Sequence, residues 1–275
     1  MKGPGLFSDI GKKGKDLLFK DYTCDQKLTF STSTATGLGL TTTAVKKGGL
    51  CVGDVTTKYK FKNTTVDLKV DTESNISSTV TLEELLPFTK AITTFKFPDY
   101  NSGKLEVQYF HDHAGVAGVV ALKQSPTVDF SATLGAHGIV FGAEAGFDTS
   151  SGAFTKYNAG LSFTKSDYVV AVTLADKGDT LKASYLQQLN EKQKSAAVAE
   201  ITRKFSTNEN TITVGGLYEL DAFTTVKTRF HNNGKLGALL QHQLKPNNVL
   251  TISGEFDTKA LDKQPRFGLG LAIKP

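Results

Sequence analysis

From about residue 25 onward, apolar and polar side chains alternate along the chain, and this period of two predicts β-strands. In residues 54–62, DVTTKYKFK, one face carries Val55, Thr57, Tyr59 and Phe61, and the other carries mostly lysines. The same alternation returns in TTVDLKVD (64–71), KLEVQYF (104–110), VDFSATLGA (128–136) and RFGLGLAI (266–273). Each predicted strand therefore has one face suited to apolar surroundings and one suited to water.

Short turn signals separate these strands. Examples are KKGG (46–49), NSG (101–103), DKGD (176–179) and NNG (232–234), and no linker or shift in composition divides them. We therefore expect one domain, residues 1–275, with a helical segment at 1–22 followed by hairpins over 25–274. Dividing about 250 residues by roughly 13 per strand and turn gives about 19 strands.

Two architectures show this alternation, a sandwich of two packed sheets and a closed barrel. An open sheet of this width would leave long unpaired edges, which closure removes. The polar face is often Gly, Ser, Thr or Lys, whereas the apolar face carries Phe, Tyr, Leu and Val, as a lipid-facing exterior around a wet lumen requires. The pattern favours an all-β transmembrane barrel, apolar outside and polar inside.

Residues 6–20, LFSDIGKKGKDLLFK, break the period of two. At roughly 100° per residue their apolar side chains fall on one side, which predicts a short amphipathic helix; these are Leu6, Phe7, Ile10, Leu17 and Leu18, together with Gly14. Gly11 and Gly14 weaken such a helix by about 1 kcal/mol each relative to Ala, so it needs a surface on which to dock. Two placements stay open: on the lipid outside, or inside the pore with its lysines in water.

Charge and cysteine content add limits. The chain has 32 Lys+Arg against 27 Asp+Glu, a net charge of +5 that is too dispersed for a nucleic-acid arm but suits a lumen visited by anions. Cys24 and Cys51 form no C-x-x-C pair or other metal-ligand spacing, so no disulfide framework is expected. The longest apolar run, residues 114–122, is far below the roughly 18 residues of a transmembrane helix.

Three segments resemble the voltage-dependent anion channels, the mitochondrial porins of eukaryotes, and most closely the plant members. They are DIGKKGKDLLFKDY (9–22), YELDAFTTVKTRFHNNGKLGALL (218–240) and the last strands, QHQLKPNNVLTISGEFD followed by RFGLGLAIKP. The resemblance covers essentially the whole chain. It implies a barrel of about 19 strands, the first and last parallel, with the N-terminal helix in the lumen. Where animal members often have a glycine-rich hinge after the helix, this chain reads DYTCDQ (21–26).

The same resemblance implies a function. The expected function is a voltage-gated, weakly anion-selective channel of the mitochondrial outer membrane for passive diffusion of small hydrophilic metabolites such as ATP, ADP and phosphate, with plastid or other membranes as a second location. Membrane lipid, anionic metabolites, hexokinase and a second copy are the implied partners, and nucleic acid is not expected. We expect no enzyme activity and no cofactor.

Candidate site residues come from two sources. The resemblance places Lys12, Lys15 and Lys20 at the constriction, and the alternation places further basic residues on the lumen wall; these are Lys58, Lys60, Lys62, Lys227 and Arg229. In the last strand, four residues match the pattern that outer-membrane insertion machinery reads, namely Arg266, Gly268, Leu271 and Ile273.

Two other classes of function are compatible with parts of the pattern. The alternative to a channel is a soluble or peripheral β-sheet protein that binds acidic ligands, for which the unbroken apolar faces are unsuited. An enzyme would need a site, and only His111 and His113 resemble one, since two His at i and i+2 on a strand can ligate a metal. No third ligand is visible beside them, so no metal is expected.

Overall fold

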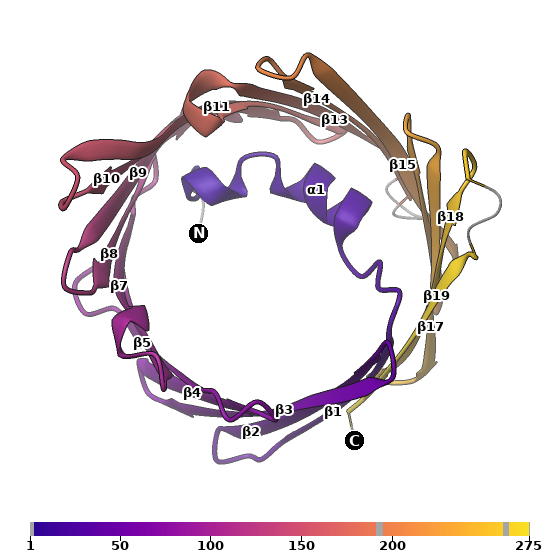
Figure 1. The fold of residues 1–275 in the computed structure, drawn as a ribbon, viewed down its shortest axis with the longest axis horizontal. Coiled ribbons are helices and arrows are strands. Elements are labelled where there is room, and N and C mark those ends of the chain that lie inside the picture. The colour runs from indigo at the N-terminus through magenta and orange to yellow at the C-terminus, as the bar shows by residue number, and fades with distance from the viewer. Residues whose placement is uncertain (1–2, 191–194, 261–263, 275) are drawn as a thin grey trace.

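Nineteen strands of the described residues join edge to edge in one ring, seen end-on in Figure 1. The computed structural model describes residues 3–190, 195–260 and 264–274. The strands are β1 Gln26–Ser33, β2 Leu38–Lys47, β3 Leu50–Phe61, β4 Thr64–Asp71, β5 Ile76–Glu83, β6 Thr89–Phe97, β7 Gly103–Phe110, β8 Ala114–Leu122, β9 Thr127–Ala136, β10 Ile139–Asp148, β11 Ala153–Thr164, β12 Tyr168–Ala175, β13 Thr180–Asn190, β14 Ser195–Lys204, β15 Glu209–Asp221, β16 Thr224–His231, β17 Lys235–Lys245, β18 Asn248–Asp257 and β19 Arg266–Ile273. The expected strand count is confirmed.

The ring closes where the two ends of the sheet meet. β1 pairs with β19 in parallel, from Gln26 opposite Leu269 to Phe30 opposite Ile273, while β1 and β2 pair antiparallel. Every hairpin reverses the strand direction, so an odd number of strands leaves the first and last pointing the same way. The parallel seam expected from the resemblance is confirmed, and among the described strands each one is paired on both sides.

The two faces of the wall differ as the alternation predicts. Large apolar side chains on the outer face are well exposed, for example Phe130, Leu134 and Phe141 on β9 and β10. On β3, Val55, Tyr59 and Phe61 share the exposed apolar face, whereas Lys58 and Lys60 face the other way. Such a wall is stable with lipid outside and water inside.

The N-terminal segment lies inside the barrel (Figure 1). This decides between the two placements left open by the sequence. It consists of a 3-10 turn, η1 Phe7–Asp9, and one short helix, α1 Lys12–Phe19; two further 3-10 turns, η2 Tyr100–Ser102 and η3 Asp176–Gly178, connect strands. No helix among the described residues has the length and hydropathy to cross a membrane.

The expectation of one continuous helix over residues 6–20 is wrong. The chain leaves the helical conformation at Ile10 and Gly11, where Gly11 has φ 74°, a left-handed value that glycine adopts without steric cost. The bend lets η1 and α1 each pack on a different part of a curved wall. Residues 1–2 of the expected helical segment lie outside the described residues.

Candidate functional site

An apolar patch on the lumen wall holds α1. Leu17 and Leu18 of the helix are buried against Val198 of β14, and Leu186, Ala196 and Leu217 of β13–β15 pack around them. Leu18 is fully buried. Sequence reasoning missed this patch because it assumed a polar inner face. The signal was present, since Leu186 and Val198 are large apolar residues in the phase of the polar positions.

The segment before α1 lies on glycines of β8–β11. Thr133 of β9 donates a hydrogen bond of 2.5 Å from Oγ1 to the carbonyl oxygen of Gly5. A Cβ at Gly142 would come within 2.8 Å of the Phe7 ring. Because glycines leave the wall without side chains here, the N-terminal segment contacts the wall backbone directly.

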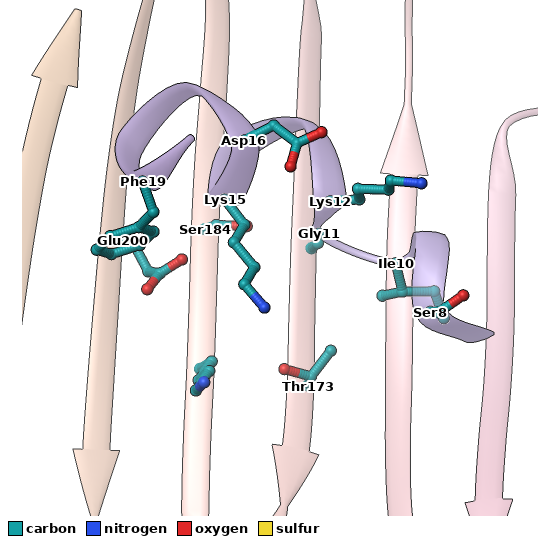
Figure 2. Close-up of a pocket in the computed structure, with 12 residues that line it drawn as sticks. Ser8, Ile10, Gly11, Lys12, Lys15, Asp16, Phe19, Thr173, Ser184 and Glu200 are labelled. Atoms are coloured by element: carbon teal, nitrogen blue, oxygen red, sulfur yellow. The ribbon is translucent and has the colours of Figure 1, made fainter. Parts of the chain in front are cut away.

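Between α1 and β12–β14 lies a cavity of about 640 Å³ (Figure 2). Lys12 and Lys15 line it from the helix, and Lys182 and Glu200 line it from the wall. Figure 2 shows the Lys15 side chain extending beside Glu200. Lys12 also forms an ion pair with Asp9, Nζ to Oδ1 3.3 Å. The structure therefore adds Lys182 to the basic residues expected in this region. The acids beside them are Asp16 and Glu200, which line the cavity, and Asp9, which pairs with Lys12.

The other basic candidates do not join this cluster. Lys20 is exposed at the end of α1. Lys58 and Lys60 of β3 form long ion pairs of 3.9 Å with Asp67 and Glu83, and their side chains stay more than half exposed to the lumen.

Lys62 is not on the wall, contrary to the alternation. β3 ends at Phe61, so Lys62 lies in the turn before β4, with φ 49°. Its Nζ is 5.5 Å from the centroid of the Phe61 ring, which belongs to the outer apolar face. The period of two applies only while the strand continues, and the turn starts one residue earlier than the pattern suggested.

Lys227 and Arg229 of β16 are lumen-facing but covered. Their side chains are 10% and 12% exposed. Lys227 Nζ lies 3.5 Å from Asp21 Oδ2, and Arg229 Nη2 lies 2.8 Å from Glu255 Oε2. Both charges are therefore cancelled locally by a carboxylate.

The last strand has the two faces expected. Phe267 and Leu269 are exposed on the outer face, which they share with Leu271 and Ile273. Gly268 faces inward under the carbonyl oxygen of Thr23. The use of Arg266, Gly268, Leu271 and Ile273 as an insertion signal stays a prediction.

The two histidines of the metal hypothesis lie in the turn between β7 and β8. Their ring centroids are 6.1 Å apart. Within residues 3–190, 195–260 and 264–274, no group of three or more His, Cys, Asp or Glu is placed to hold a metal ion.

A closed ring of strands with an apolar exterior, basic side chains on its inner face and an N-terminal helix inside it defines a transmembrane β-barrel channel. Residues 3–268 match the family described as eukaryotic porin, and the chain belongs to that family. Its relatives include outer-membrane porins of mitochondria and an outer-membrane porin of plastids.

Mitochondrial outer membrane protein porin 5 of Oryza sativa subsp. japonica is 64% identical, with 100% of this chain and 99% of that protein aligned. Mitochondrial outer membrane protein porin 2 of Arabidopsis thaliana is 62% identical over the same shares. The outer plastidial membrane protein porin of Pisum sativum is 49% identical over both full chains. Among solved structures, a mutant porin of Rhodopseudomonas blastica aligns with TM-score 0.49 and 9% identity over 88% of this chain and 94% of that one, too weak a likeness to carry an argument.

Proposed function

We propose that this porin is a voltage-gated, weakly anion-selective channel of the mitochondrial outer membrane, through which ATP, ADP and phosphate diffuse passively. The observation that carries the proposal is the basic excess around the cavity beside α1, which is lined by three lysines, Lys12, Lys15 and Lys182, against two carboxylates, Asp16 and Glu200. Basic side chains along a pore select anions by electrostatic potential.

The selectivity is weak for a physical reason. The lysines at the constriction and on β3 are exposed to water, and each of Lys12, Lys58 and Lys60 has an acidic neighbour within 4.0 Å. Solvated charges are screened over about 8 Å at physiological ionic strength. An anion is therefore attracted into the lumen without being held there, and metabolites leave again.

Planar-bilayer recording of the purified, refolded protein tests the channel proposal. In a KCl gradient we expect a large open state whose reversal potential favours chloride, and closure when the voltage is stepped to either polarity. Silence after verified reconstitution would contradict the proposal and favour the alternative of a β-sheet protein that binds acidic ligands.

Voltage gating requires that charge moves in the field, at about 2.3 kcal/mol per charge per 100 mV. The basic helix α1 is the proposed moving element. A Cβ at Gly14 would lie 3.6 Å from Cβ of Ser184, within the range for a disulfide. The variant Gly14→Cys with Ser184→Cys, made with both native cysteines replaced by Ser, can therefore lock α1 to β13. If the oxidised and reduced forms gate equally, α1 is excluded as the moving element.

The partners stay predictions. Hexokinase and a second copy of the chain are expected at the mouth and in the membrane, respectively, from the family alone. A plastid location is supported by the pea relative, whose name places it in the plastidial outer membrane.

A further inference from the structure

The segment that leaves α1 crosses the lumen face of β16–β19, and Arg229 contacts it at several points. Arg229 Nη1 donates a hydrogen bond of 3.3 Å to the carbonyl oxygen of Leu18, one of the last carbonyls of the helix. Nη2 of the same guanidinium donates 2.8 Å to Glu255 Oε2 on β18. One side chain thus links the helix end to two strands of the wall.

Two aromatic rings, Phe19 at the end of α1 and Tyr22 in the segment after it, lie beside the same guanidinium. The Arg229 Cζ lies 4.3 Å from the centroid of the Tyr22 ring and 5.8 Å from that of Phe19, distances typical of cation–π interactions. Gly237 on the neighbouring strand makes this arrangement possible, because a Cβ there would lie 2.8 Å from Arg229 Nε. The arginine side chain is therefore enclosed by ring faces, a carboxylate and bare backbone.

The backbone beyond Tyr22 is also seated. Ser253 of β18 donates a hydrogen bond from Oγ to the carbonyl oxygen of Thr23. At Gly268 of β19 a Cβ would overlap that same carbonyl oxygen. The absence of a side chain at Gly268 is thus required by the path of the segment within the lumen.

We propose that Arg229 is a positioning residue that clamps residues 18–23 to β16–β19 and thereby fixes where α1 presents Lys12 and Lys15. Its charge is cancelled by Glu255 and its side chain is 12% exposed, so it acts as a clamp rather than as a contact for passing anions. The segment DYTCDQ (21–26) stands where animal members of the family often have a glycine-rich hinge. Here the contacts of Tyr22 and Thr23 hold it against the wall. This role goes beyond the proposed transport function and can be tested without measuring current.

Cys24 provides a reporter within the clamped segment. It is partly buried, and burial raises the pKa of its thiol, so maleimide labelling is slow while the segment is seated. The other thiol, Cys51, is exposed and is replaced by Ser in all variants. Arg229 lowers the pKa of Cys24, so the loss of its charge alone would slow labelling. Faster labelling in an Arg229 variant therefore reports release of the segment.

The experiment compares R229Q with K58Q in refolded protein in lipid vesicles. Both variants remove one lumen-facing cation and leave one carboxylate unpaired, Glu255 or Asp67, but only the first touches the segment. We expect R229Q to label about tenfold faster or more, the effect of losing a charge-assisted hydrogen bond on a local opening equilibrium, and K58Q to label at the parent rate. R229K, which keeps the charge but not the planar fork, should restore part of the protection.

Equal labelling of R229Q and K58Q would overturn the proposal. If R229Q does not refold, the exchanged pair R229E with E255R is used instead. It keeps both charges in the lumen but removes the donor from the Leu18 carbonyl, so its labelling should also rise, and labelling at the parent rate would overturn the proposal. Since labelling requires no conductance, failure of the channel proposal would leave this result interpretable.

Discussion

The walls formed by β3–β5 and by β16–β18 carry the same kind of lumen-facing ion pair and use it differently. Lys58 and Lys60 are 61% and 58% exposed, whereas Lys227 and Arg229 are 10% and 12% exposed. The N-terminal segment covers only the second wall (Figure 1). A basic residue in the polar phase of a strand therefore becomes either a solvated pore charge or a clamp, depending on what lies over it.

The energies of the two kinds of pair differ for the same reason. An exposed ion pair contributes about 0.2–1 kcal/mol because water and salt screen it. Removing one partner of a buried pair costs more, since the remaining charge stays desolvated. The open wall thus offers its charge to passing ions, and the covered wall uses its charge to position the chain.

The largest expected effect is on ion selectivity, and it concerns the exposed lysines of the N-terminal segment. Replacing Lys12, Lys15 and Lys20 together by Glu should turn the anion preference into a cation preference, because the potential at the constriction changes sign. The reversal potential in a KCl gradient measures this. The matched control replaces Lys123, Lys165 and Lys177 by Glu. These lysines lie in turns outside the strands, so the control should shift the reversal potential far less. Equal shifts in both variants would remove the constriction assignment.

The next effect tests whether close backbone approach fixes the segment. Gly115→Ala would place a methyl group against the Gly5 carbonyl and within 2.7 Å of Thr133 Oγ1, so we expect the unfolding free energy to fall by about 2 kcal/mol. Gly118→Ala on the same strand has no atom within 4 Å and should change it by less than about 0.5 kcal/mol. Urea unfolding in detergent gives both values, and equal values would show that the segment moves aside freely.

A smaller effect compares the two walls directly. Lys227→Gln should lower the unfolding free energy by about 1 kcal/mol, a partial cost because Asp21 is 40% exposed and regains water. Lys58→Gln should lower it by less than about 0.5 kcal/mol while weakening chloride preference. The same urea experiment applies. If Lys58→Gln proves the more destabilising, the distinction between clamp and pore charge fails.

The last effect appears at high pH. Burial raises the pKa of Tyr22 to about 12, with Arg229 acting in the opposite direction. A phenol whose pKa is higher folded than unfolded contributes stability that is complete below about pH 10 and is lost as pH rises toward 12. Tyr22 is only half-buried, so after allowance for solvent screening we expect about 1 kcal/mol. The unfolding free energy of the parent should therefore fall more between about pH 10 and 12 than that of Tyr22→Phe. Parallel pH profiles of the two proteins would contradict the burial of this ring.

Much of the barrel was predictable from local pattern. Alternation on β3 and β19 identified the lipid face because each side chain position is set by the backbone pleat alone. The interruption at Gly11 and the end of β3 at Phe61 were not predictable, since a glycine or a lysine is compatible with continuing as well as with turning. Leu186 and Val198 show the same limit. The alternation places both on the inner face, but their role in packing depends on a helix more than 150 residues away in sequence.

The sequence by itself determined the strands, their two faces and the existence of an amphipathic N-terminal segment, because these follow from periodicities within about ten residues. The odd strand count came from the resemblance to the channel family. Only the tertiary structure decided where that segment lies and which charges it covers. Arg229 and Lys58 are indistinguishable as members of an alternating strand, yet one is enclosed by Phe19, Tyr22 and Glu255 and the other faces water. Burial is a property of the neighbours that closure of the barrel brings together, and no local pattern encodes it.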